Sequence, residues 1–567
     1  MIYSTKQVTP KQLIAIVLLL TLTIFQLVRV IVFVNVYGGL EHDGGWFLGV
    51  SRSLAERGTY TTLVSTLVDP AIPAGINVDH KFDIQDDEGR IWFFTGNGIG
   101  PAIIGVDALF LKLFGVGFWQ LHLGPLFFFT AYLLLAGVIL LLVRGLSSVL
   151  LFNLYLFLYP QLSIFLGYEA MGEVPSMAYI LLTYLLFAYT VEQVYNSPDN
   201  LSSTKRRHLI LFFLSGLVAG LAINAKLIAL LSLGGIGVIW LKLVWQRRVN
   251  LKQSLALVLG TLTVPALWEL IHLVVITRLT NFEMYRRHLQ ERIRFIADDG
   301  SGFGAQDHKG LEFLWEKALI ISEISHPQAF FSLLTLLLVA AGGLVLIWLY
   351  RRNQVQQNWI LLLWVGWLGN TIWFIGLAKT GWVRHAWFGL ILGVMVLAVI
   401  FGEAVYRVSK RPDWRNIVAT LLVVGILLPG FVAQRPAATV FISDDLVEMW
   451  RQKQLAAKYA KVPWIITPRA EQQRVVDFLQ QLPAEGRVFY PANHKAAEIA
   501  VQTGKIFYPI ERRELMSPAE GDVILIGATL ISPWKDPGIR HSLIERAKVE
   551  CPNFLYQSDS FIICTQW

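Results

Sequence analysis

Long apolar segments alternate with short polar ones over most of the chain. A helix of about 20 apolar residues spans the hydrocarbon core of a bilayer, so each segment of that length predicts a membrane-spanning helix. We expect about eleven of them, near residues 13–36, 118–143, 146–166, 174–195, 208–224, 227–246, 254–277, 328–350, 357–378, 383–406 and 416–433. Two longer polar intervals, 37–117 and 278–327, are predicted to be loops. The pattern indicates a polytopic α-helical membrane protein.

The hydrophobic pattern changes near residue 465, beyond the last apolar segment. Helical and strand-like segments alternate from there, with helices predicted near 471–481, 495–503 and 542–548 and strands at 487–490, 505–508 and 523–527. We therefore expect a transmembrane module over 1–433, a linker over 434–464 and a small soluble α/β domain over 465–567.

The two cysteines of the chain, Cys551 and Cys564, flank a segment that predicts a β-hairpin turning near 557–559. Residues at these positions would lie roughly opposite each other, so a cross-strand disulfide is expected, with two separate core thiols as the alternative. A disulfide would require an oxidising compartment for this part of the chain.

Composition and charge narrow the class of protein. Hydrophobic residues make up 55% of the 567 residues and charged residues 16%, which excludes a soluble protein of this size. The net charge of +8 would fit a nucleic-acid partner, but the basic residues fall largely in short loops between the apolar segments. No nucleic acid is therefore expected as a partner.

The basic loops all fall on one side of the membrane if the spans alternate. They contain Lys6, Lys11, Arg144, Lys205, Arg206, Arg207, Arg247, Arg248, Lys252, Arg351, Arg352, Arg407, Lys410, Arg411 and Arg415. The positive-inside rule makes that side cytoplasmic. We expect a protein integral to the plasma (inner) membrane, with a cytoplasmic N-terminus, both long loops and the C-terminal domain outside, and a first span too long for a signal peptide.

A pair of carboxylates follows the first span, in the segment 41–46 (EHDGGW). A carboxylate close to lipid is costly to place there and useful for chemistry at the membrane surface, which makes Asp43 a candidate general base. The alternative is that Asp43 caps a helix that begins near Trp46 and ends at Gly58.

Two charged residues lie at the outer ends of later spans. Glu173 begins the fourth span, where it could instead serve the positive end of its helix, and Glu169 lies one turn before it. Lys226 interrupts two apolar segments in 220–226 (GLAINAK) and must pair with an anion or reach the membrane surface as an anchor.

Further cations precede or follow other spans. Arg384 opens the tenth span and suits bidentate phosphate binding, while the adjacent His385 could donate to phosphate or serve the structure alone. In the loop after the seventh span, arginines fill much of a predicted interfacial helix. Of these, Arg286, Arg287 and Arg292 could grip a phosphate, or the helix could only anchor the loop.

These residues resemble, in type and position, those of the GT-C membrane glycosyltransferases, broadly the group that includes the protein O-mannosyltransferases and the aminoarabinose transferases. That family has an acidic residue after the first span, another at the outer start of the span corresponding to Glu173, a stretch similar to 220–226, and often Arg-Tyr where this chain has Arg384 and His385. Its Gly/Pro-rich turn resembles 94–101 (FTGNGIGP), with Gly96 and Gly98. The resemblance covers about the first 430 residues.

The resemblance implies the GT-C fold and transfer of a sugar from a polyprenyl-phosphate carrier to an acceptor hydroxyl outside the cytoplasm, with inversion. Asp43 would be the base, Glu173 would orient the acceptor or donor, and Arg384 and Lys226 would bind the phosphate. The family's adjacent acidic pair is absent because Gly44 follows Asp43. Glu41 could replace the missing partner, and without the pair a divalent metal is not favoured.

Two other classes remain open from the sequence. A transporter or flippase for a lipid-linked sugar would also be polytopic, although such proteins usually show internal repeats and charges at the midplane. A non-catalytic membrane assembly protein could use the C-terminal domain to recruit a partner. The sugar and the acceptor (a lipid, glycan or protein) are not identified by any motif.

Overall fold

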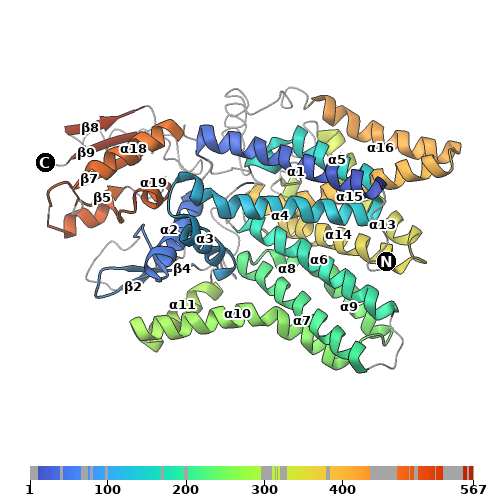
Figure 1. Ribbon diagram of the computed structural model, residues 1–567, viewed down its shortest axis with the longest axis horizontal. Coiled ribbons are helices and arrows are strands. Elements are labelled where there is room, and N and C mark those ends of the chain that lie inside the picture. The colour runs from blue at the N-terminus through green and yellow to red at the C-terminus, as the bar shows by residue number, and fades with distance from the viewer. Residues whose placement is uncertain are drawn as a thin grey trace.

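The computed structural model describes the helices, the strands and most of the short connections between them (Figure 1). The described residues are 10–38, 42–65, 74–76, 81–95, 100–165, 168, 172–196, 202–294, 310–312, 314, 315, 317, 318, 329–378, 383–433, 469–483, 486–490, 496–517, 519–527, 553–558 and 561–565.

Every predicted span coincides with helix. In chain order these helices are α1 (Pro10–Tyr37), α4 (Phe118–Arg144), α5 (Leu146–Leu158), α6 (Glu173–Asn196), α7 (Ser202–Ala225), α8 (Ala229–Ser232), α9 (Gly234–Trp245), α10 (Leu251–Leu279), α13 (Ala329–Leu349), α14 (Gln354–Ile372), α15 (Val383–Lys410) and α16 (Trp414–Ala433). Among the described residues, seven helices are long and apolar enough to cross a membrane, and four shorter apolar ones accompany them. The prediction of a polytopic helical membrane protein is confirmed.

Some boundaries differ from the predicted ones. The segment predicted over 227–246 is divided into α8 and α9 at Leu233, and α5 and α14 are followed by short π-helices, η1 (Gln161–Phe165) and η3 (Trp373–Leu377). A break of this kind leaves the hydrophobic pattern unchanged, so the pattern did not reveal it.

The helix α15 lies at the centre of the bundle, whereas α10 lies at its edge. Most of α15 is buried against α14, α5, α16 and α4. In contrast, α10 packs closely on α7 and exposes leucines such as Leu259, Leu262 and Leu270. A surface of this composition suits contact with lipid rather than water.

Glycines set the close crossing of α7 and α10. A Cβ on Gly216 would lie 2.2 Å from the carbonyl oxygen of Leu257, and a Cβ on Gly260 would lie 2.2 Å from that of Phe213. Together with Gly220 one turn further, this is the small-residue spacing by which membrane helices approach backbone to backbone.

The interval after α1 folds into two helices and a sheet. The helices are α2 (His42–Arg57) and α3 (Pro101–Phe114), and the strands are β1 (Thr61–Thr62), β2 (Ala74–Ile76), β3 (Lys81–Gln85) and β4 (Ile91–Thr95) in the antiparallel order β1-β4-β3-β2. The helix predicted to begin near Trp46 begins at His42 instead, and it ends before Gly58, which has a positive φ.

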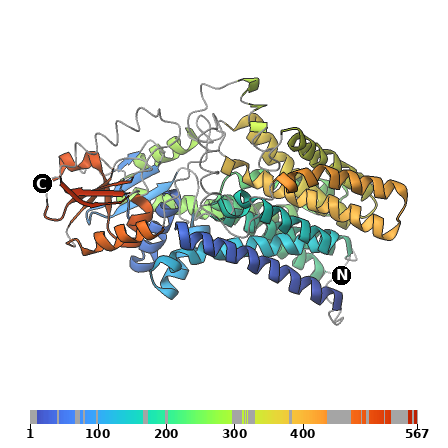
Figure 2. The ribbon, with the colours of Figure 1, turned by 90° about the horizontal axis from the view of Figure 1, so that it is seen from above.

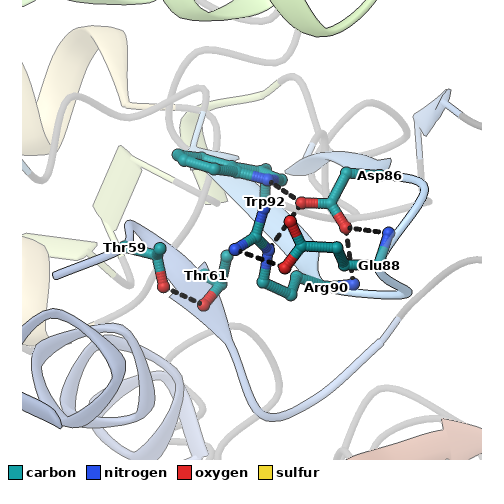
Figure 3. A network of polar contacts seen from close by, with 6 residues as sticks. All are labelled: Thr59, Thr61, Asp86, Glu88, Arg90 and Trp92. Atoms are coloured by element: carbon teal, nitrogen blue, oxygen red, sulfur yellow. Dashed lines mark hydrogen bonds and ion pairs between the residues drawn. The ribbon is translucent and has the colours of Figure 1, made fainter. Parts of the chain in front are cut away.

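Asp86 accepts several hydrogen bonds in the turn between β3 and β4. Asp86 accepts hydrogen bonds from the Nε of Arg90 at 2.7 Å and from the Nε1 of Trp92 at 2.8 Å, and Figure 3 shows both side chains pointing at it. Burial alone would raise the pKa of Asp86, but these hydrogen bonds outweigh it and hold the pKa below its usual value.

The C-terminal segment forms the expected α/β domain. It contains α18 (Arg469–Gln481), β5 (Val488–Tyr490), α19 (Ala496–Thr503), β6 (Phe507–Pro509), the 3₁₀ helix η5 (Ile510–Leu515), β7 (Val523–Gly527), β8 (Asn553–Gln557) and β9 (Phe561–Thr565). The sheet order is β6-β5-β7-β9-β8, with β6, β5 and β7 parallel. The predicted helix at 542–548 and the linker 434–464 lie outside the described residues.

The predicted C-terminal hairpin is present. Strands β8 and β9 pair antiparallel, with Phe554 opposite Cys564. Cys564 is disulfide-bonded, while Cys551, the other half of the predicted disulfide, lies outside the described residues.

The sheet of the first loop and the C-terminal domain occupy one end of the helix bundle, which we call the domain end; the start of α1 lies at the other end (Figures 1 and 2). One hydrophobic core joins the two regions. It includes Trp46 and Val50 of α2, Val475 of α18 and Ala500 of α19. The backbone continues this contact, since Phe507 exchanges hydrogen bonds with Leu63 and Ser65.

Candidate functional site

Two of the predicted site residues form a buried ion pair at the domain end. The Nζ of Lys226 lies 2.8 Å from the Oε1 of Glu173. Glu173 is 1% exposed and Lys226 is 8% exposed. The other carboxylate oxygen, Oε2, accepts no hydrogen bond from the described residues. Because burying two charges is costly, such a pair is weak evidence for stability alone and draws attention to function.

Small residues allow α6 and α7 to bring this pair together. A Cβ on Gly172 would lie 2.3 Å from the carbonyl oxygen of Ala225 and 3.2 Å from the Cδ of Lys226. One turn into α6, the hydroxyl of Ser176 donates to the carbonyl of Ala222 at 2.9 Å. The start of α6 therefore lies directly against the end of α7.

The start of α3 packs on the same place. The Oδ1 of Asn224 accepts from the amide of Ala102 at 3.3 Å, and its carbonyl accepts from the amide of Gly100 at the same distance. A Cβ on Gly100 would lie 2.5 Å from the amide group of Asn224. The end of the Gly/Pro-rich turn therefore lies next to the residues that precede Lys226. Gly96 and Gly98 lie outside the described residues.

The first turn of α15 adds two further predicted residues. Arg384 is 7% exposed and His385 is 8% exposed. His385 is within electrostatic reach of both Arg384 and Lys226. The ion pair of Glu173 and Lys226 and the buried Arg384 and His385 thus come from three separate parts of the chain.

Lys317, in the second long loop, is a cation that the sequence analysis missed. It is fully buried, and its Nζ donates to the carbonyl of Ala378 at 2.5 Å, beside the ring of Phe374. Burial lowers the pKa of Lys317 to about 8. Ala378 precedes Arg384 by six residues, so Lys317 is attached to the chain that leads into α15. A lone lysine beside apolar residues was the available signal.

The predicted base stands at the start of α2. Asp43 is the second residue of that helix, so its backbone lies in the first turn, while its side chain is outside the described part of the structure. Glu41 and Glu169 lie outside the described residues.

The arginines of α11 (Phe282–Arg294) belong to a different group of side chains. Arg292 contacts both carboxylate oxygens of Glu269 in α10 at 2.6 Å. Arg286 pairs with Glu283 at 2.7 Å on the surface, and Arg287 is exposed. The contact of Arg292 with Glu269 fastens α11 to α10, beside which it lies in Figure 1, and the pair of Arg286 with Glu283 lies within α11.

A second buried carboxyl, Asp107 of α3, was also missed. Neither of its oxygens accepts a hydrogen bond from the described residues, and burial raises its pKa to about 8. Nearby, the hydroxyl of Tyr168 lies 2.5 Å from the Nδ1 of His122. An aspartate among the apolar residues in the first half of α3 was the sequence signal. Among the described residues, no three His, Cys, Asp or Glu side chains are grouped so as to hold a metal.

No protein-family model and no curated protein matches the chain. Solved structures do. The crystal structure of ArnT from Cupriavidus metallidurans bound to undecaprenyl phosphate matches with a TM-score of 0.51 at 12% identity, covering 98% of both chains. The apo structure of the same protein matches with a TM-score of 0.50 at 12% identity, covering 98% of this chain and 97% of that one. ArnT is an aminoarabinose transferase of the GT-C fold. The chain therefore has the fold of the GT-C membrane glycosyltransferases.

Proposed function

We propose that this protein is a glycosyltransferase that moves a sugar from a polyprenyl-phosphate carrier to an acceptor hydroxyl at the extracytoplasmic membrane face. The observation that carries the proposal is the buried ion pair of Lys226 with Glu173, 2.8 Å between Nζ and Oε1, with buried His385 within electrostatic reach of Lys226 and Arg384. The fold, shared with an enzyme whose crystal structure holds undecaprenyl phosphate, supports the same reading.

The charges at the domain end suit a departing phosphate. When the bond between the anomeric carbon and the phosphate oxygen breaks, its electron pair stays on the phosphate, and nearby cations stabilise that charge. Lys226 and Arg384 are the cations proposed for this role, with His385 as a further donor. Glu173 would share Lys226 with the phosphate and accept a hydrogen bond from a sugar or acceptor hydroxyl through its second oxygen.

Asp43 is the proposed general base. It would take the proton of the acceptor hydroxyl while the acceptor oxygen attacks the anomeric carbon on the face opposite the phosphate. Attack from that face inverts the anomeric centre, because nucleophile and leaving group occupy opposite sides of the ring. The acceptor stays open, and the sugar, a hexose or a pentose, is not assigned.

We do not assign binding of the carrier phosphate to the arginines of α11 in this proposal. Arg292 is occupied by Glu269, and Arg286 and Arg287 are exposed, so we infer that α11 rests at the membrane interface near anionic headgroups. The collection of charged residues at one end of the bundle favours surface chemistry over transport, which usually places its binding site at the midplane.

The test is release of polyprenyl phosphate from a panel of polyprenyl-phosphate-linked hexoses and pentoses, with envelope membranes as the source of acceptor. Asp43→Asn should lower the rate by about 100-fold or more, as loss of a general base does. It should leave polyprenyl-phosphate binding unchanged, whereas Lys226→Met and Arg384→Met should weaken that binding.

Two exposed residues provide matched controls. Glu88→Gln removes a carboxylate from the β3–β4 turn, and Lys112→Met removes a cation from the end of α3. Both variants should transfer sugar at the unmodified rate. Full activity of a correctly inserted Asp43→Asn protein would refute the assignment of the base.

A further inference from the structure

The C-terminal domain contacts the start of α2, within three residues of Asp43. A Cβ on Gly45 would lie 2.6 Å from both the carbonyl carbon of Ala497 and the amide nitrogen of Glu498 in α19. Both of these residues are fully buried. The two backbones are therefore in direct contact, and the position has no room for a side chain.

The same helix of the C-terminal domain is held along the next turns of α2. The Nη1 of Arg52 donates to the carbonyl of Val501 at 2.7 Å and to that of Gln502 at 3.3 Å. The side chain of Val501 packs with Leu48 in one buried cluster. The helix α19 thus fixes both the position of α2 and its rotation.

The other helix of the C-terminal domain, α18, contacts the part of the chain that precedes Asp43 in the sequence. Gly38, which ends α1 with φ at +80°, lies against Gln472 of α18, where a Cβ would come within 2.7 Å of its Oε1. In the same helix, Arg469 donates to the Oδ1 of Asn35 at 2.5 Å and lies over the ring of Phe118.

The two contacts belong to one packed body, because side chains of α18 and α19 share a core with β5 and β7. The chain between Gly38 and Gly45 therefore connects two points that are both held by the C-terminal domain. We propose that this domain is a positioning device for Asp43, setting the distance between the base and the Glu173–Lys226 pair. The inference rests on the proposed function, in which Asp43 is the base.

A displaced base lowers turnover without changing how the carrier phosphate binds. A shift of about 1 Å in a catalytic group can cost about 100-fold in rate. A purely structural role of the contact would instead lower stability and all functions together.

The test compares two glycine substitutions in α2 of the full chain. Gly45→Ala forces α19 away, whereas Gly49→Ala, one turn later, places its Cβ at an ordinary 3.6 Å from the amide nitrogen of Leu63. Gly45→Ala should lower kcat by about tenfold or more and leave the Kd for polyprenyl phosphate within about twofold. Amide exchange in the first two turns of α2 should become faster. Gly49→Ala should match the unmodified protein in all three measurements.

A second pair of variants serves if Gly45→Ala does not fold. Arg52→Met removes the hydrogen bonds to α19, and Arg57→Met removes an exposed arginine from the same helix. Arg52→Met should lower kcat and accelerate exchange of α2, and Arg57→Met should do neither.

Three results would overturn the inference: unchanged exchange of α2 in both Gly45→Ala and Arg52→Met, unchanged kcat despite faster exchange, or loss of carrier binding as large as the loss of kcat. Failure of the proposed function gives a different result. The unmodified protein would then release no polyprenyl phosphate from any donor, while amide exchange would still report whether the C-terminal domain holds α2.

Discussion

The carboxyl of Asp107 has a packed, buried environment that its position in the sequence did not predict. A Cβ on Gly124 of α4 would overlap its Oδ1, so this carboxyl is packed directly on the neighbouring helix. Burial raises its pKa to about 8 because the charged form loses its hydration there. Folding therefore favours the protonated carboxyl, and the folded state should lose stability as pH rises from the unfolded pKa, near 4, towards 8.

Replacing Asp107 with asparagine should remove that pH dependence. Asparagine has nearly the same shape and no charge, so Asp107→Asn should raise the thermal midpoint relative to the unmodified protein at pH 8.5 and change it less at pH 5. Thermal unfolding of the detergent-solubilised protein at the two pH values measures this. A lower midpoint for the variant at pH 8.5 would show that the ionised carboxylate is stabilised by a partner.

Asp86 is a control, because its contribution to stability depends on pH in the opposite direction. Its pKa is lowered by hydrogen bonds from Trp92 and Arg90, so its contribution to stability is present above the unfolded pKa and is lost only in acid (Figure 3). Asp86→Asn should therefore lower the thermal midpoint at pH 5 and at pH 8.5 alike.

Among single residues, the sequence allowed us to predict those charged residues that lie at the end of an apolar segment. Glu173, Lys226 and Arg384 were found in that way. Their mutual contact was not predictable, since the pairing of Glu173 with Lys226 joins the ends of two different helices. Asp107 and Lys317 were missed because a single charge inside a mixed or apolar segment has no distinctive spacing.

The ends of helices, rather than their middles, build the candidate site. Glu173 begins α6, Lys226 follows α7, and Arg384 lies in the first turn of α15. Their mutual positions depend on how closely the helix ends approach, and at Gly172 an added Cβ would lie 2.3 Å from the carbonyl oxygen of Ala225.

Gly172→Ala should therefore displace Lys226. The added methyl group would meet the carbonyl of Ala225 and the stem of Lys226, so the affinity for polyprenyl phosphate should fall by about tenfold, or about 1.4 kcal/mol. Equilibrium binding to the protein in nanodiscs measures it.

The matched control is Gly237→Ala in α9, where a Cβ would have nothing within 4 Å. This variant should bind the carrier as the unmodified protein does. Equal affinities for both variants would mean that the spacing of α6 and α7 does not position the phosphate site.

Helices were the most predictable elements, because the length of an apolar segment is set by the membrane. The sheet in the first loop was not predicted, since its strands are short and one of them, β1, has only two residues. The start of α2 was placed four residues late because its first turn contains two glycines, which favour helix weakly.

On the scale of the whole molecule, the loop after α1 and the C-terminal domain form one packed unit, although more than 400 residues separate Ser65 from Arg512. The guanidinium of Arg512, 2% exposed, donates to Ser65 at 3.3 Å and to Gln85 at 2.8 Å. The separate α/β pattern of the tail was visible in the sequence. Its docking was not, because contacts between distant segments leave no periodic signal.

Arg512→Met should loosen that docking. Loss of buried hydrogen bonds from a charged group costs about 1–3 kcal/mol, so the thermal midpoint should fall. Arg513→Met is the control, since the Nε and Nη1 of Arg513 find no partner among the described residues. Scanning fluorimetry of both variants measures the difference, and equal midpoints would show that Arg512 does not join the two regions.

The most direct measurement of the central claim is an experimental structure of the protein with a polyprenyl phosphate bound. We expect the phosphate to contact Lys226 and Arg384 at the domain end, with the side chains of Asp43 and Glu173 facing the same space. Phosphate bound among the α11 arginines instead, with Asp43 turned away from it, would contradict the assignment of both the donor site and the base.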